Sequence, residues 1–202
     1  MSSETAPISH NQPQQSPGST LLHETILACC LVLLIVGCRW AIDTPNFKPV
    51  MAVALFAGFL FSRRWMGIVT LAAGMLISDT LLGFYEWHVQ VTVYFALLFP
   101  LVLGLIMKRW KGDSMKLPTG VLGFAGLSAV NFYVLTTIAV WGWSDWYPQT
   151  ISGLASAFAM GLPFLKWTLA GNLFFSVMLF GGWAAFTRVT GDSTVIVPQN
   201  AA

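Results

Sequence analysis

Stretches of apolar residues, separated by short polar or charged connections, fill most of the chain beyond residue 21. Six such runs are present, at residues 22–41, 49–61, 65–84, 89–107, 118–141 and 163–186. A run that is apolar on all sides is typical of a membrane helix, because lipid gives backbone N–H and C=O groups no partner outside the helix. The pattern therefore predicts an all-α, polytopic membrane protein with six transmembrane helices.

One short run and four prolines refine this prediction. The run at residues 49–61 is shorter than the ~20 residues that cross a bilayer, so it needs its flanking residues or burial by neighbouring helices to span. Pro49, Pro118 and Pro163 stand near the starts of runs, where a missing N–H costs little. Pro100 falls inside the fourth run, and we expect it to kink that helix.

The six runs define one domain with a tail at each end. Residues 1–20 are polar and rich in Ser, Pro and Gln, so they are predicted to be a disordered cytoplasmic tail. They carry no basic stretch directly before an apolar run, which argues against a cleaved signal peptide. The transmembrane domain is expected at residues 21–188, and a second cytoplasmic tail at 189–202. Residues 151–162, before the sixth run, are a candidate for a short helix at the membrane interface.

Composition agrees with the membrane class. Of the 202 residues, 56% are hydrophobic and 9% are charged, and the mean hydropathy is +0.71. Soluble domains usually carry about 25% charged residues. The net charge of +2 is too small to indicate nucleic acid as a partner. The cysteines, Cys29, Cys30 and Cys38, lie in the first run without metal-ligand spacing, and we expect them to be buried thiols.

Charged residues are distributed unevenly between the two ends of the predicted bundle. If all six runs cross, one side carries Arg63, Arg64, Lys108, Arg109, Lys111, Lys116 and Arg188. The opposite side carries Arg39, Lys48 and Lys166, with the acids Asp43, Asp79, Glu86 and Asp145 on or near it. Because positive charge marks the cytoplasmic side, both termini of this multi-pass protein are predicted to be cytoplasmic.

Polar side chains lie inside the outer parts of the later runs. With a rise of about 1.5 Å per residue, Asp79 is roughly 21 Å from Trp65, and Asn131 roughly 20 Å from Pro118. Intramembrane polar groups tend to face the bundle interior and mark binding sites, so we predict a cavity open to the outside. Its candidate substrate-binding residues, including an aromatic rim, are Asp79, Thr80, Tyr85, Trp87, His88, Tyr94, Asn131, Tyr133, Trp143, Tyr147 and Asn172.

Each of these groups also has a structural interpretation. Asn131 and Asn172 can join helices by hydrogen bonds, and Asp79 can cap a helix or occupy a structural pair. The outer Trp and Tyr residues can form an ordinary aromatic belt, with His88 as a plain interfacial residue. Small residues that permit close helix packing recur at Ala54, Gly58, Gly67, Gly74, Gly120, Gly123 and Gly126.

The sequence lacks the motifs of common catalytic and nucleotide-binding sites. It has no HExxH, GxSxG, Walker A or GxGxxG pattern. Asp79, Glu86 and His88 are the groups that remain for a membrane enzyme, and no nucleophile accompanies them. We therefore expect no enzymatic activity, no metal site and no resident cofactor.

A set of short motifs resembles a known family. The motifs are PNFKPV at residues 45–50, ALFAG at 54–58, RRW at 63–65, SDxLLG at 78–83, YPxT at 147–150, GL at 153–154, PF at 163–164 and LxGNL at 169–173. Their order over residues 22–188 resembles the S components of ECF vitamin transporters, which are six-helix bacterial membrane proteins. Within that group the chain is most similar to the solitary cobalamin transporters of the BtuM type.

The resemblance implies an S-component-like bundle in the bacterial cytoplasmic membrane. It implies cobalamin as the transported ligand, held by the outer loops and the outer halves of the later helices. The cobalt-ligating cysteine of that type corresponds to Thr80, so cobalt–thiolate chemistry does not carry over, and His88 is the nearest candidate axial ligand. The first run lacks the AxxxA docking motif, which fits uptake without a dedicated ECF module.

These observations leave two classes of function. The first is a vitamin-type substrate-binding transporter, with a small molecule and membrane lipid as its partners. The second is a structural or assembly subunit of a larger membrane complex, without a ligand of its own.

Overall fold

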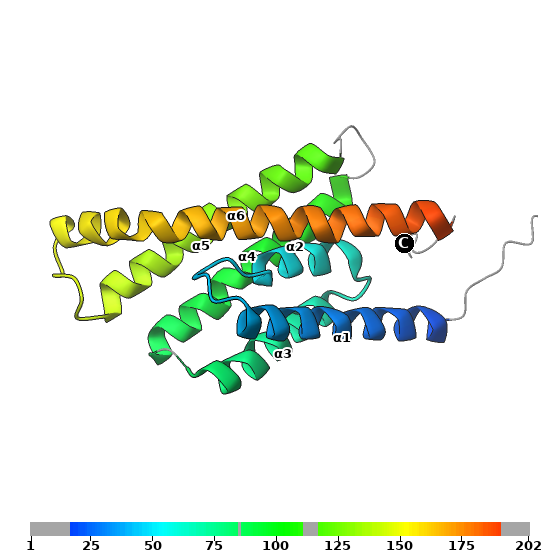
Figure 1. The fold of residues 1–202 in the computed structure, drawn as a ribbon, viewed down its shortest axis with the longest axis horizontal. Helices are drawn as coiled ribbons and strands as arrows, with labels where there is room; N and C mark the ends of the chain where they lie inside the picture. Colours follow the sequence, from blue (N-terminus) through cyan, green and yellow to red (C-terminus); the bar gives the residue numbers. More distant parts are fainter. Residues whose placement is uncertain (1–16, 85, 111–116, 191–202) are drawn as a thin grey trace, which may run out of the picture.

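The computed structural model describes residues 17–84, 86–110 and 117–190, and this part of the chain is entirely helical apart from its connections. Its helices are α1 (Pro17–Ala41), α2 (Val50–Leu60), α3 (Arg64–Leu82), α4 (Trp87–Trp110), α5 (Leu117–Trp143) and α6 (Ile151–Thr190) (Figure 1). The all-α prediction is confirmed. The prediction of a tail over residues 1–20 is wrong for residues 17–20, which open α1, and the C-terminal helix continues to Thr190. The remaining tail residues lie outside the described ranges.

Five of the described helices are long and apolar enough to cross a bilayer. They are α1, α3, α4, α5 and α6, and the two longest stretches are Thr119–Trp143 and Ile151–Thr190. The exception is α2, whose 11 residues rise only ~16 Å. The helices are therefore compatible with a multi-pass membrane protein, with α2 as the short member.

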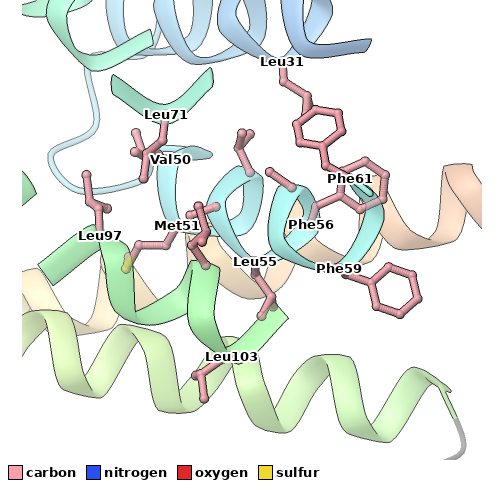
Figure 2. Packing of buried hydrophobic residues seen from close by; sticks show 14 of the residues in the cluster. Leu31, Val50, Met51, Leu55, Phe56, Phe59, Phe61, Leu71, Leu97 and Leu103 are labelled. Carbon is pink, nitrogen blue, oxygen red and sulfur yellow. The ribbon is translucent and has the colours of Figure 1, made fainter. Parts of the chain in front are cut away.

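The short helix α2 is the centre of the molecule, and α4, α6 and α3 surround it (Figure 1). Residues 50–59 are all buried. Figure 2 shows Met51 and Leu55 of α2 in the same apolar cluster as Leu97 and Leu103 of α4. Such a buried helix end needs partners for its last carbonyl groups. Lys108 supplies one, because its Nζ donates to the Phe61 carbonyl oxygen at 3.0 Å.

Two glycines bring the backbones of α2 and α4 together. A Cβ built on Gly58 would lie 2.1 Å from the Leu101 carbonyl oxygen, and one on Gly104 would lie 2.1 Å from the Leu55 carbonyl oxygen. Small-residue packing is thus present at Gly58 and also at Gly74, which faces Ile35. It is absent at Gly123 and Gly126, where a Cβ would meet nothing within 4 Å.

Helix α6 is one continuous helix of 40 residues. Its start is capped by Thr150, whose Oγ1 accepts a hydrogen bond from the Gly153 backbone N–H at 3.1 Å. The predicted break before Pro163 is therefore wrong: Pro163 lies inside α6, and the expected interface helix is the first part of α6. Pro100 likewise lies inside α4, which continues through it.

The connections α1–α2, α3–α4 and α5–α6 lie toward one end of the molecule, at the left of Figure 1. The start of α1 and the end of α6 lie at the other end. Helix α1 packs mainly against α3, so much of its surface has no neighbour. The prediction of buried thiols is therefore wrong for Cys29 and Cys30, which are exposed, while Cys38 is partly covered.

We predict that Gly104→Ala destabilises the fold by about 1–3 kcal/mol, because the added methyl group overlaps the α2 backbone. Thermal unfolding in detergent measures the effect. Gly123→Ala is the matched control, since it adds the same methyl group in open space on another helix. Equal melting temperatures for the two variants would contradict the close α2–α4 contact.

Candidate functional site

Asp79 is fully buried and joins three helices. Its Oδ1 pairs with Nη2 of Arg39 on α1 at 2.7 Å. Its Oδ2 accepts hydrogen bonds from the Tyr94 hydroxyl at 2.8 Å and from the Gln90 side chain, both on α4. The Arg39 guanidinium also donates to the Met75 sulfur at 2.8 Å. Asp79 thus forms a structural ion pair, which is one of the interpretations that the sequence allows. Its contacts hold the nearby ends of α1, α3 and α4 together.

A cavity of about 650 Å³ opens beside this network. Its walls come from all six helices and from the α1–α2, α3–α4 and α5–α6 connections. The lining residues of each helix lie in the half nearer to these connections. Most of the lining is apolar, and a few polar groups converge on it, as is usual for small-molecule sites of 300–1,000 Å³. The polar and charged lining residues are Arg39, Asn46, Lys48, Glu86, Tyr133, Thr136, Thr137, Ser144, Tyr147 and Thr168.

Two predicted site residues, Tyr133 and Tyr147, line this cavity. The Tyr133 hydroxyl donates to the Phe158 carbonyl oxygen, which fixes the ring against α6. Gly161 makes room for that ring, since a Cβ there would lie 2.8 Å from it. Tyr133 is therefore a rigid part of the wall, and its hydroxyl hydrogen is already used within the protein.

Five of the predicted intramembrane polar residues do not line the cavity: Asp79, Thr80, Tyr94, Asn131 and Asn172. Asn172 is buried and donates from Nδ2 to the Ala125 carbonyl oxygen at 2.7 Å, which joins α6 to α5. Asn131 has a buried Nδ2 without a hydrogen-bond partner among the described residues. Thr80 is exposed, and its hydroxyl donates to the Ile77 carbonyl oxygen at 2.7 Å. None of Asp79, Asn131 and Asn172 lines this cavity, in contrast to the expected arrangement.

The predicted aromatic rim is partly assembled. The rings of His88 and Trp143 stack with centroids 5.6 Å apart and planes 8° apart, and Trp87 lies 3.5 Å from His88 between centroids. This stack connects the start of α4 to the end of α5, and the loop after it brings Tyr147 to the cavity. Tyr85 lies outside the described residues.

The connection between α1 and α2 is fixed by its own sequence. Asn46 has a positive φ of 61°, a conformation that Asn tolerates better than most residues. Phe47 then packs its ring on Phe174 and Phe175 of α6 at 5.8 and 5.6 Å between centroids. Gly171 permits this approach, because a Cβ there would lie 3.0 Å from the Phe47 Cα. The turn places Lys48 at the cavity wall.

Lys48 caps the end of α1 from across this turn. Its Nζ donates to the Arg39 carbonyl oxygen at 3.3 Å and to the Ile42 carbonyl oxygen. Burial, together with the nearby Arg39 charge, lowers the pKa of Lys48. The surroundings of Lys48 at the cavity wall thus disfavour the charged form of its ammonium group.

Sequence reasoning placed Arg39 and Lys48 on the outer side but missed their part in the site. It also missed Gln90, Thr137 and Ser144. An arginine on the same predicted side as a buried acid was the available signal for the Arg39–Asp79 pair, because a charge inside a membrane requires a partner. Among the described residues, no three His, Cys, Asp or Glu side chains gather as metal ligands, so the site offers charge, hydrogen bonds and apolar contact.

The architecture and site define a helical protein with membrane-compatible helices and a large cavity at one end. Residues 19–194 match the model of a family described as "Family of unknown function (DUF6580)". Since the match covers most of the chain, the protein belongs to this family. No curated protein and no solved structure matches the chain.

We predict that Asp79→Asn lowers the free energy of unfolding by about 3–5 kcal/mol, because it leaves the largely buried Arg39 guanidinium without its counter-charge. Asp43→Asn is the control, since Asp43 is an exposed acid close to the end of α1. The double variant Arg39→Met with Asp79→Leu should recover most of the loss. Thermal unfolding in detergent checks all three, and a D79N variant as stable as D43N would contradict the role of the pair.

Proposed function

We propose that this protein is a membrane-embedded substrate-binding protein that takes up a vitamin-type small molecule from outside the cell. The observation that supports this proposal most is the cavity of about 650 Å³. It lies at one end of the molecule and is lined by residues of the helices and of their connections. Its size and its mainly apolar lining suit a ligand with a flat apolar body and a few polar groups. The rigid walls around Tyr133 and the Arg39–Asp79 pair would hold it preformed.

The proposed membrane placement is the bacterial cytoplasmic membrane, with six spanning segments and both termini in the cytoplasm. Support comes from the end of the molecule opposite the cavity, where Arg63, Arg64, Lys108 and Arg188 begin or end helices. Lys111 and Lys116 belong to the same predicted side but lie outside the described residues. In this orientation the cavity opens outward, and α2 crosses only with the help of its flanking residues.

Cobalamin is the specific ligand that the S-component resemblance favours, with uptake that needs no dedicated ECF module. The site would hold it without a cobalt ligand from the protein, since neither Thr80 nor His88 lines the cavity. His88 is engaged in the Trp143 stack instead. A corrin would therefore be recognised by its amide groups and its apolar face.

A role as an assembly subunit is the second candidate. One observation favours it: Gly123 and Gly126 of α5 and Gly181 and Gly182 of α6 have nothing within 4 Å of a built Cβ. Open small-residue surfaces allow another helix to approach closely. Co-purification with a stable partner, without stabilisation by any vitamin, is the result that would favour this candidate.

We predict that cobalamin or another vitamin raises the melting temperature of the protein in lipid nanodiscs, and that Val140→Trp abolishes this shift by filling the cavity. Val130→Trp is the matched control, because Val130 is 46% exposed on the same helix and does not line the cavity. The function is contradicted if no vitamin in the panel shifts the wild type, or if V140W responds as fully as V130W.

The orientation has its own test. In a background in which the three cysteines are replaced by serine, we predict that Asp145→Cys, in the α5–α6 connection, reacts with a membrane-impermeant thiol reagent added to intact cells. Ser62→Cys, in the α2–α3 connection, should react only after the cells are opened. The reverse labelling pattern would place the cavity toward the cytoplasm.

A further inference from the structure

We propose that the ligand of the cavity carries one anionic group, of the size of a carboxylate, on an otherwise apolar body, and that Lys48 binds this group. The inference rests on the proposed function, because it names the substrate class of the same site: a small vitamin-type acid, in place of the amide-rich corrin of cobalamin. It follows from three features of the cavity: the charges that line it, the hydrogen bonds already made by its polar groups, and its apolar walls.

The charged groups that line the cavity are Arg39, Lys48 and Glu86. Arg39 is neutralised by Asp79 at 2.7 Å and donates further to the Met75 sulfur. Glu86 is exposed. Lys48 is therefore the one lining cation, among the described residues, whose ammonium has no carboxylate within 4.0 Å.

Lys48 retains capacity for a ligand. Its ammonium has three donors, and two of them are directed to the carbonyl oxygens of Arg39 and Ile42. Since Lys48 lines the cavity, the third donor remains for a ligand there. Burial and the Arg39 charge lower the pKa of Lys48, and the Asp43 charge opposes them. An anion bound to the ammonium would further offset the effects of burial and of Arg39.

Four hydroxyl groups that line the cavity already donate to carbonyl oxygens and are poorly suited to an anion: those of Tyr133, Thr136, Ser144 and Thr168. The hydroxyl hydrogens of Thr136 and Ser144 are donated to the α5 carbonyl oxygens of Phe132 and Val140 at 2.8 and 2.5 Å. What these groups present to a ligand is oxygen lone pairs, which repel an anion and accept from N–H or O–H donors. Because Lys48 is charged, it is a better partner for the anionic group than the neutral Thr137 and Tyr147 hydroxyls. Ligand donors are directed to the oxygens of Thr136 and Ser144.

The remaining lining limits the ligand to a single small anion. Val93, Leu97, Phe132 and Val140 offer no hydrogen bonds and would leave a second charged group unsolvated. Glu86 adds a negative charge to the same cavity, so a polyanion such as a pyrophosphate would be repelled. An aromatic or alicyclic monocarboxylate fits each of these constraints.

The test uses indole-3-butyrate and its uncharged primary amide as probes, with the indole N–H as the donor for the oxygens of Thr136 and Ser144. Concentration-dependent melting shifts in nanodiscs give the apparent affinity for each probe. The wild type is expected to bind the carboxylate at least about tenfold more tightly than the amide, the effect of one charge-assisted hydrogen bond. Lys48→Gln, which keeps a donor for the α1 carbonyls, should lose this preference, and Lys48→Arg should keep it.

Lys166→Gln is the matched control, because Lys166 is exposed on α6 and does not line the cavity. Equal binding of both probes by the wild type, or an unchanged preference in K48Q, would overturn the inference. The proposed function would still stand in that case, provided that V140W abolishes binding. Failure of both probes to bind would also overturn it. If the vitamin panel fails as well, the proposed function falls with it.

Discussion

The pairing of Arg39 with Asp79 is the constraint on which the cavity end of the molecule depends. Both side chains are almost completely buried, so each is tolerable only because the other is 2.7 Å away. Hydrogen bonds from Tyr94 and Gln90 bring α4 into the same network, which thereby fixes α1, α3 and α4 relative to one another. The Arg39 carbonyl oxygen in turn accepts a hydrogen bond from Lys48, so the same pair helps to set the position of Lys48 at the cavity wall.

The short helix α2 is the second constraint, and it holds the centre of the molecule together. It is too short and too thoroughly buried to contact lipid along most of its length, and its side chains pack against α3, α4 and α6. Gly58 and Gly104 bring the backbones of α2 and α4 close together. The cavity of about 650 Å³ lies beside the Arg39–Asp79 network, and the first residues of the tightly packed α2 form part of its wall.

The helices could be predicted from the sequence because apolar runs of this length have few alternatives. One exception is Pro163, which the apolar pattern predicts as a helix start. Helix α6 begins twelve residues earlier, at Ile151, where Thr150 caps it, and it continues through the proline. The site was predictable only in part. Tyr133 and Tyr147 line the cavity as predicted. Whether Asn172 faces a ligand or the Ala125 carbonyl oxygen depends on the rotation of its helix about its axis. A sequence run that is apolar on all sides does not reveal this rotation. Lys48 was hidden because its partners are backbone atoms.

The central claim is that the outer cavity holds a small molecule rather than merely separating helices. Native mass spectrometry of the protein, released from nanodiscs after gentle purification, tests it most directly. The account predicts one non-lipid small molecule bound per chain, which dissociates when the cavity is filled by a tryptophan at Val140. A spectrum with only lipid or detergent adducts, identical for wild type and filled variant, would contradict it.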